Sequence, residues 1–398
     1  MNNEAKIADK INQANDIVID ILQKNDPYWV GVRPAIECVP DMREGLILHS
    51  GPEIEWDEMS ETQRQGGING VLFEGYAKTR EDAEHLLKTG EITFASGNDY
   101  HIVVPGSGIA TPSMVMNIVE DRNSGVRGFC APFEGPNRGG LAGWGVYNEA
   151  IDKHLHNMSD VIGPAITRML EEACGLILTN ELAKMIFDTK SMNDDEKRQV
   201  MDLIFGTVRF FHPLGMASAM SGLEAARHVP YSTVVTAMEG NGVTYGIKVA
   251  GLGNQWFTAP APRLEGEYVA ADIKVEDVLP WIGDSCMLEA CGLGGSAAAA
   301  APAVMRSQGL SWMDGIERSR LTEEITLARH ESYLVPALDY QGTPLGIDIR
   351  KVLRTGIEPV IHGGIISKSG KRLGAGVAHV PMKCFEGAIE GYAERYGL

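Results

Sequence analysis

Several features of familiar protein classes are missing from this 398-residue sequence. It contains no unbroken apolar run of about eighteen residues, the length that a membrane-spanning helix requires. Basic residues are few: 35 Lys and Arg stand against 53 Asp and Glu, which gives a formal net charge of −18. Because nucleic acids and anionic membranes attract basic surfaces, this balance argues against both as partners.

Cysteine is also scarce, and its spacing excludes common metal and redox motifs. The six cysteines form no Cys-x-x-Cys pair, and the segment from Met1 to Lys6 has no apolar core of the signal-peptide kind. His154 and His156 are two residues apart and would face different sides of a helix. We therefore expect a cytoplasmic protein with reduced thiols, no metal and no other cofactor.

The apolar pattern predicts a mixed α/β (α+β) fold in which a small helical bundle is inserted between two mixed α/β domains. The expected boundaries are 1–150 for an N-terminal α/β domain, 151–229 for the bundle and 230–398 for a C-terminal α/β domain. In the first region we expect helices at 7–22 and 79–87 and strands at 45–49, 70–73, 102–104 and 114–119. A glycine-dense loop follows at 133–145.

The later regions carry equally clear periodicity. Apolar residues three and four apart predict helices at 158–173, 176–187, 194–205, 216–226, 312–333 and 385–396. Alternating β-formers around Asn241-Gly242 predict a hairpin of strands 233–238 and 243–249.

The segment from Gly283 to Ser296, which runs into five alanines and Pro302, is the most suggestive motif. Glycines before a helix start leave backbone N–H groups free for a phosphate or carboxylate. The candidate anion-binding residues of this segment are Asp284, Ser285, Gly292, Gly294, Gly295 and Ser296. Two alternatives stay open: a loose dinucleotide fingerprint, which Pro302 disfavours, and close helix packing that needs no ligand.

Other candidates are side chains beside glycines or prolines. His362 precedes Gly363-Gly364 and would act as a general acid or oxyanion donor, or would simply be a turn histidine bonded to backbone. Glu74 and Glu134 each precede a glycine and would orient an amide NH₂. Arginines suited to clamping an anion, rather than to surface ion pairs, are Arg33, Arg122, Arg138 and Arg350.

Short sequence blocks that together carry a family resemblance are spread along nearly the whole chain. They are 72–75, 232–238 with 241–242, 251–253 with 256–260, 283–285 with 292–295, 346–350, 355–356, 374–376 and 384–386. In these blocks and their order, the chain resembles the YlbE/YahG-like family, one member of which is a subunit of the oxamate carbamoyltransferase of anaerobic allantoin breakdown. Many members carry a Gly-Asp-Glu-x-His-x-Arg-Asn stretch in the helical region, which is missing here between Met185 and Asp195.

The resemblance implies carbamoyl transfer between phosphate and an oxamate-like amide, in a homo- or hetero-oligomer with an FdrA-like partner subunit. The implied substrates, carbamoyl phosphate and oxamate or oxalurate, are small anions that need no cofactor. The 292–296 turn would then hold phosphate or carboxylate, Arg350 would clamp it, and His362 would assist proton transfer. The alternatives are a non-catalytic scaffold subunit and a related ligase or acyl transferase for another small acid.

Overall fold

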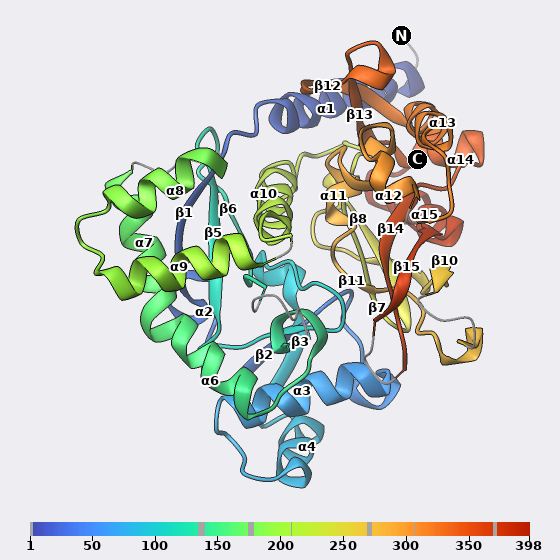
Figure 1. The fold of residues 1–398 in the computed structure, drawn as a ribbon. Coiled ribbons are helices and arrows are strands. Elements are labelled where there is room, and N and C mark those ends of the chain that lie inside the picture. Colours follow the sequence, from blue (N-terminus) through green and yellow to red (C-terminus); the bar gives the residue numbers. More distant parts are fainter. Residues whose placement is uncertain are drawn as a thin grey trace. The chain divides into compact units, whose positions relative to one another are not determined.

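The computed structural model describes residues 3–133, 140–173, 179–207, 209–268, 273–306, 308–368 and 372–398. The chain forms two compact units (Figure 1). Unit 1 contains Met1–Asn25 and Gly222–Leu398, and unit 2 contains Asp26–Ser221. Unit 2 is therefore an insertion in the sequence of unit 1.

Unit 2 contains two three-stranded sheets. The first is antiparallel, in the order β1 (Pro27–Pro34), β5 (Val115–Asp121) and β6 (Arg127–Cys130). The second has the order β3 (Thr93–Ser96), β2 (Leu46–His49) and β4 (Ile109–Ala110). Strands β2 and β3 are parallel, because the helices α3 (Glu61–Phe73) and α4 (Arg80–Thr89) connect them as a crossover. Thr79 caps the start of α4, and Gly90 ends it in the left-handed conformation.

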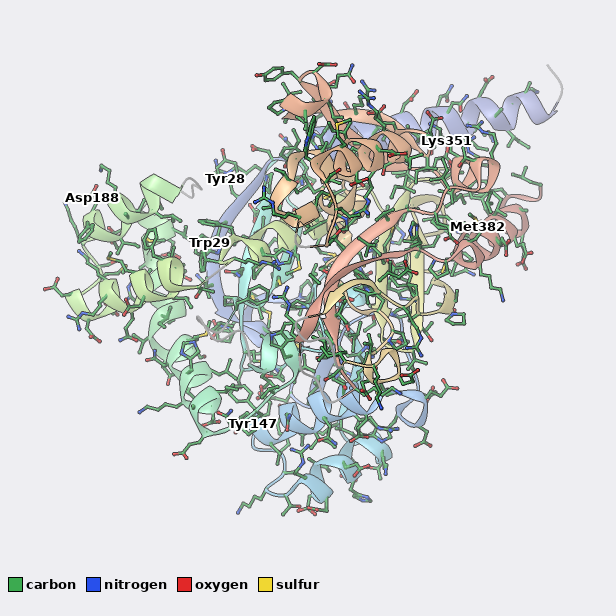
Figure 2. The ribbon with its side chains drawn as sticks, turned by 45° about the vertical axis from the view of Figure 1, so that its right-hand side comes forward. Tyr28, Trp29, Tyr147, Asp188, Lys351 and Met382 are labelled. Carbon is green, nitrogen blue, oxygen red and sulfur yellow. The ribbon has the colours of Figure 1, made fainter. Side chains whose placement is uncertain are left out.

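The remaining helices of unit 2 mostly follow its sheets in sequence. They are α2 (Ala35–Cys38), α5 (Leu141–Trp144), α6 (Glu149–Asn157), α7 (Gly163–Glu172), α8 (Thr179–Asp188) and α9 (Asp194–Gly206), with a π-helical turn at Met158–Ile162. Helix α10 (Phe211–Ala225) begins in unit 2, and its residues from Gly222 onward belong to unit 1. Trp29 is fully buried on β1, beside Tyr28 (Figure 2), and its ring meets Phe210 edge to face at 5.8 Å. Thr167 of α7 ties the helices to β1 by accepting from Val32 N–H at 2.9 Å.

Unit 1 contains two sheets and a hairpin. One antiparallel sheet has the order β11 (Ile282–Gly283), β7 (Val235–Asn241), β8 (Thr244–Val249) and β9 (Phe257–Pro260). The other has the order β10 (Glu265–Tyr268), β15 (Arg372–His379) and β14 (Val360–Ile366), with β14 and β15 as a long red pair in Figure 1. Strands β12 (Thr326–Val335) and β13 (Gln341–Ile347) form the hairpin.

The helices of unit 1 come from both ends of the chain. They are α1 (Asn3–Gln23), α11 (Met287–Ala290), α12 (Pro302–Arg306), α13 (Trp312–Glu323), α14 (Ile349–Thr355) and α15 (Met382–Tyr396). Buried Asn15 fixes α1 to the segment before β7, because its Oδ1 accepts from Thr233 N–H and from Ser232 Oγ, both at 2.9 Å. The first helix of the chain is thus part of the same core as the last.

The mixed α/β class is confirmed, as are the predicted hairpin around Asn241-Gly242 and the first and last helices. Three predicted elements are wrong. Residues 70–73 are the last turn of α3, where Gly70 lets the helix pack closely: a Cβ there would lie 2.3 Å from Ile109 Cδ1. Residues 102–104 make only an isolated bridge, and the helix predicted to reach residue 333 ends at Glu323 before β12. The three-domain division at 150 and 229 stays a prediction beside the two compact units.

Candidate functional site

The glycine turn after β11 begins no α-helix. Gly294–Ala300 forms a kinked 3₁₀ turn, and α12 starts only at Pro302, a residue suited to the first position of a helix. Gly292 and Gly294 have φ of +82° and +52°, which glycine adopts without strain. The amide of Ser296 donates to Leu293 O, and its Oγ donates to Glu289 O.

A carboxylate of the chain itself occupies this turn. Glu289, which is 2% exposed, accepts through Oε1 from Gly295 N–H at 2.8 Å and from His362 N–H at 3.1 Å. A Cβ on Gly294 would lie 2.5 Å from the carboxylate. Burial raises the pKa of Glu289 to about 7, although these hydrogen bonds favour the charged form. Binding of an external anion by the 292–296 turn stays a prediction, and at Gly295 such an anion would have to replace Glu289.

His362 lies within β14 rather than at a strand end, paired with Val377. Its Nε2 lies 2.9 Å from Nη1 of Arg318, which can only donate, so the ring proton belongs on Nδ1. Burial and the Arg318 charge lower the pKa of His362 to about 4. At neutral pH the imidazole is therefore uncharged, and its Nδ1 proton is one that it can donate. Its predicted role in proton transfer stays a prediction.

Two of the four predicted arginines, Arg350 and Arg33, pair with carboxylates of the chain itself. In unit 1, Arg350 in the first turn of α14 contacts the fully buried Asp348 with its Nε and Nη2, the shortest distance being 2.7 Å. In unit 2, Arg33 pairs with Glu171 at 3.4 Å on the surface. Their roles as substrate clamps stay predictions.

The other candidates are divided between the two units or fall outside the description. Glu74 of unit 2 follows the last residue of α3 and accepts from the amide and hydroxyl of Ser113 at 2.8 and 2.7 Å. Its catalytic role stays a prediction. Arg122 of unit 2 lies over the Tyr28 ring, 3.2 Å from its centroid. Glu134 and Arg138 lie outside the described residues. Ser285 begins the turn into α11, where its carbonyl accepts from Leu288 N–H.

Unit 1 also buries three charged side chains, of which only Asp284 was a candidate from the sequence. Glu239, Lys248 and Asp284 have no exposed surface. Lys248 pairs with Ala237, two residues before Glu239 on β7, so Lys248 and Glu239 share one face of the sheet. Asp284 directly follows Gly283, which pairs with Gly240. Lys248 Nζ lies over the Trp256 ring, 4.4 Å from its centroid.

The charges of Glu239, Asp284 and Glu289 act on one thiol, that of Cys286. Burial raises the pKa of the Cys286 thiol, and the charges of Glu289, Asp284 and Glu239 raise it further. We call Glu239, Lys248, Asp284 and Glu289 the buried charge cluster. Burying several charges in a protein interior is expensive, and such groups concentrate at functional sites. Glu239 was not a candidate from the sequence, because the Asn241-Gly242 signal placed it in the expected turn. In the structure, β7 continues to Asn241 and includes Glu239.

Two further searches of the described part of the chain bear on function. Among these residues, no three His, Cys, Asp or Glu side chains are grouped so that they would bind a metal ion. No described helix combines the length and apolar character needed to cross a membrane.

The molecule is thus a mixed α/β protein with one compact unit inserted in another and a buried charge cluster in unit 1. A family model described as oxamate carbamoyltransferase subunit AllG matches residues 92–186 and 171–285. The chain is 33% identical to the Escherichia coli K12 oxamate carbamoyltransferase subunit AllG, over 98% of this chain and 99% of that protein. It belongs to the AllG family.

Two other proteins match nearly the whole of this chain. The uncharacterized protein YahG of Escherichia coli K12 is 33% identical over 99% of this chain and 89% of its own length. A crystal structure of a conserved protein of unknown function from Enterococcus faecalis V583 is similar with a TM-score of 0.89 and 30% identity, covering 98% of this chain and 99% of that one.

Proposed function

We propose that this chain is a subunit of an assembly that transfers a carbamoyl group between phosphate and the nitrogen of an oxamate-like amide. The observation that carries the proposal is the 33% identity to AllG over nearly the whole of both chains, which leaves no large part of either protein unmatched. The word subunit in the name of the AllG relative supports an assembly with other subunits. An FdrA-like protein is the proposed partner, because it is the partner that the family resemblance implies.

The reaction defines what a site must supply. In one direction, the amide nitrogen of oxamate attacks the carbonyl carbon of carbamoyl phosphate. A C–N bond forms, the C–O bond to phosphate breaks, and the nitrogen loses a proton. The protein must orient the two reactants, stabilise the charge that develops on the carbonyl oxygen, and accept the proton.

The buried charge cluster of unit 1 offers these groups. Lys248 supplies a positive charge for a carbonyl or carboxylate oxygen, while Glu239 and Asp284 supply acceptors for the NH₂ of a carbamoyl or amide group. Glu289, with its pKa raised to about 7, is suited to take up a proton and release it near neutral pH. His362 remains a proposed hydrogen-bond donor through Nδ1, in place of the predicted general acid.

The test is a reconstituted assembly. The chain is co-purified with an FdrA-like subunit, and oxalurate formation from oxamate and carbamoyl phosphate is measured for wild type, K248M, E289Q and the control K88M. Lys88 is half exposed on α4 of unit 2, where it pairs with Glu84. We expect K248M and E289Q to lower kcat by roughly 100-fold or more and K88M to leave it unchanged.

Three results would change the proposal. If the wild-type assembly forms no oxalurate, the proposed substrates are wrong. If it does, but K248M and E289Q are fully active with native circular dichroism, the cluster is not the site. If activity needs the chain but tolerates every cluster variant, the chain is a scaffold subunit that completes a partner's site.

A further inference from the structure

Helix α13 carries a guanidinium group to which the proposed function gives no part. Among the described residues, the other arginines that are buried or partly buried each pair with an acid: Arg64 with Glu61, Arg168 with Glu196, Arg227 with Glu224 and Arg350 with Asp348. Arg318 is also partly buried, yet no described carboxylate pairs with it. In a chain with 53 acidic and 35 basic residues, such an arginine calls for a physical explanation.

The acid whose charge acts on Arg318 is already engaged. Asp314 lies one turn earlier on α13, and its Oδ2 accepts from the amide and hydroxyl of Ser311 at 2.7 and 2.6 Å, which caps the start of the helix. Burial lowers the pKa of Arg318, and the charge of Asp314 offsets this only in part. The guanidinium group is therefore held partly out of water without a full counter-charge, which costs free energy that a bound anion would recover.

Uncharged acceptors fix one side of the guanidinium group. Nη1 of Arg318 lies 2.9 Å from Nε2 of His362 and 3.2 Å from Oε1 of Gln308. The Sδ atom of Met305 lies 3.8 Å from the same nitrogen. These neighbours orient the arginine without neutralising it. Because the side chain is already ordered, binding of an anion costs little further conformational entropy.

The other side of the guanidinium group is open. Nε and Nη2 of Arg318 have no partner in the described part of the chain, and neither is a buried atom, so both are accessible to solvent. These two N–H groups point the same way and match two oxygens of one phosphate or carboxylate group. The fixed side and the open side together make a site for a small oxyanion.

Helix α13 holds this site against the glycine turn of unit 1. A Cβ on Gly315 would lie 2.8 Å from the carbonyl oxygen of Ala298, so the glycine permits a close approach between the helix and the turn. Ser319, the residue after Arg318, accepts through Oγ from Ala299 N–H at 3.1 Å. The arginine is thus carried on a helix that is bonded to the same turn that Glu289 enters.

His362 connects Arg318 to the buried charge cluster. Its side chain accepts from Arg318, and its main-chain N–H donates to Glu289 at 3.1 Å. A ligand on Arg318 would therefore lie beside a residue that contacts the group proposed to exchange the proton. The groups proposed above serve a carbonyl or carboxylate oxygen, an NH₂ group and a proton. None of them is assigned to phosphate.

We infer that the open edge of Arg318 binds a phosphate group, which in the proposed reaction is that of carbamoyl phosphate. The inference deepens the proposed function and rests on it only for the source of this group. Phosphate fits because its oxygens match the Nε and Nη2 donors and its charge balances a guanidinium group that has no acid. When the C–O bond of carbamoyl phosphate breaks, Arg318 holds the phosphate that leaves.

The test is calorimetric binding of inorganic phosphate to the full chain and to three variants. R318M removes the charge and the two donors, and R318K keeps the charge but loses the paired donors. R320M is the control, because Arg320 is exposed two residues further along the same helix and carries the same charge. We expect phosphate to bind at least tenfold more weakly to R318M and several-fold more weakly to R318K. R320M should bind it within twofold of wild type.

A second measurement reads the site directly. The charge of Arg318 is one of the two causes that lower the pKa of His362 to about 4. A phosphate bound to Arg318 balances this charge, so saturating phosphate should raise the pKa of His362 in wild type and R320M but leave it unchanged in R318M. Titration of the His362 ring protons by NMR measures this shift.

Specific outcomes overturn the inference. If wild type binds no phosphate, or R318M binds it equally well, the open edge of Arg318 is only hydrated. If oxamate rather than phosphate needs Arg318, the site holds a carboxylate. R318K covers the case in which R318M fails to fold. Oxalurate formation is measured separately, so turnover with phosphate binding that ignores Arg318 sinks this inference alone. Absence of turnover with Arg318-dependent phosphate binding sinks only the proposed reaction.

Discussion

At the scale of single residues, the side chain of Glu289 fills the glycine turn of unit 1. Its carboxylate receives two backbone N–H groups, one from the turn at Gly295 and one from β14 at His362. The side chain thereby joins two segments that are far apart in the sequence. Its burial raises its pKa to about 7, which makes this junction sensitive to pH in the physiological range.

The first prediction concerns this pKa. A carboxyl group with a pKa of 4.5 when unfolded and about 7 when folded binds its proton more tightly in the folded state. The contribution of Glu289 to stability is therefore fully present below pH 4.5. It falls as the pH rises through 7, by about 3 kcal/mol in total. E289Q keeps an acceptor and cannot ionise, so its unfolding free energy should gain that amount relative to wild type between pH 4.5 and 7.5. Urea unfolding across this range measures it, with E74Q as the control.

The second prediction concerns His362. The charge of Arg318, whose Nη1 donates to His362 Nε2, is one of the two causes of the lowered pKa. R318M should therefore raise the pKa of His362 above its present value of about 4, whereas R318K, which keeps the charge, should change it less. Titration of the His362 ring protons by NMR distinguishes the variants, and an equal pKa in both would contradict the assigned cause.

At the scale of elements, the 3₁₀ turn after α11 depends on a glycine that has no room for a side chain. Gly294 has φ of +52°, and a Cβ would lie 2.5 Å from the Glu289 carboxylate. G294A should destabilise the protein by about 2–4 kcal/mol, which combines left-handed strain with displacement of Glu289. The matched control is G356A, where φ is +71° and no atom lies within 4 Å, and which should cost about 1 kcal/mol. Equal losses in denaturant unfolding would show that strain alone matters.

Helix α1 is fixed to the segment before β7 by buried hydrogen bonds. Asn15 supplies its buried hydrogen bonds to Ser232 and Thr233. N15A leaves the Thr233 N–H without its acceptor and should lower the unfolding free energy by about 2–4 kcal/mol. I17A, at a position on the same helix that is 52% exposed, should change it by less than about 0.5 kcal/mol. Hydrogen exchange should show α1 opening first in N15A, and uniform protection would argue against this role.

At the scale of the whole molecule, the insertion of unit 2 has a direct test. Within unit 1, a Cβ on Gly222 would lie 2.7 Å from Asn25 Nδ2, so the two ends left by removing unit 2 are adjacent. A chain that joins Asn25 to Gly222 through a few glycines should therefore fold cooperatively without unit 2, and residues 26–221 should fold alone. Circular dichroism and thermal unfolding of the two pieces measure this. A non-cooperative transition in either piece would show that the two units form one folding unit.

The sequence predicted most of what depends on local pattern, and missed what depends on long-range contacts. The hairpin at Asn241-Gly242 and the helix start at Thr79 follow from turn and cap residues within a few positions. Residues 70–73 look like a strand because Val71 to Phe73 are apolar, yet the glycines before them let α3 pack on β4. No local sequence signal indicated that Glu289 contacts Gly295 or that Arg318 contacts His362. Each contact depends on the path of the backbone between the two residues.

For the candidate site, glycine spacing indicated the turn at 292–296 but could not indicate which carboxylate fills it. Lys248 stands among β-formers, and only the strand register shows that it shares a face with Glu239.

The insertion also sets an order of events during protein synthesis. Helix α1 leaves the ribosome before unit 2, but Ser232 and Thr233, which hold it, are made only after all of unit 2. Until then, its apolar side chains Val18 and Leu22, buried in the finished protein, have no core to enter. Unit 2 is complete earlier and can fold while the rest is still being translated, which shortens the distance over which the nascent helix must search for its partners. A chaperone that shields exposed amphipathic helices would act in this interval.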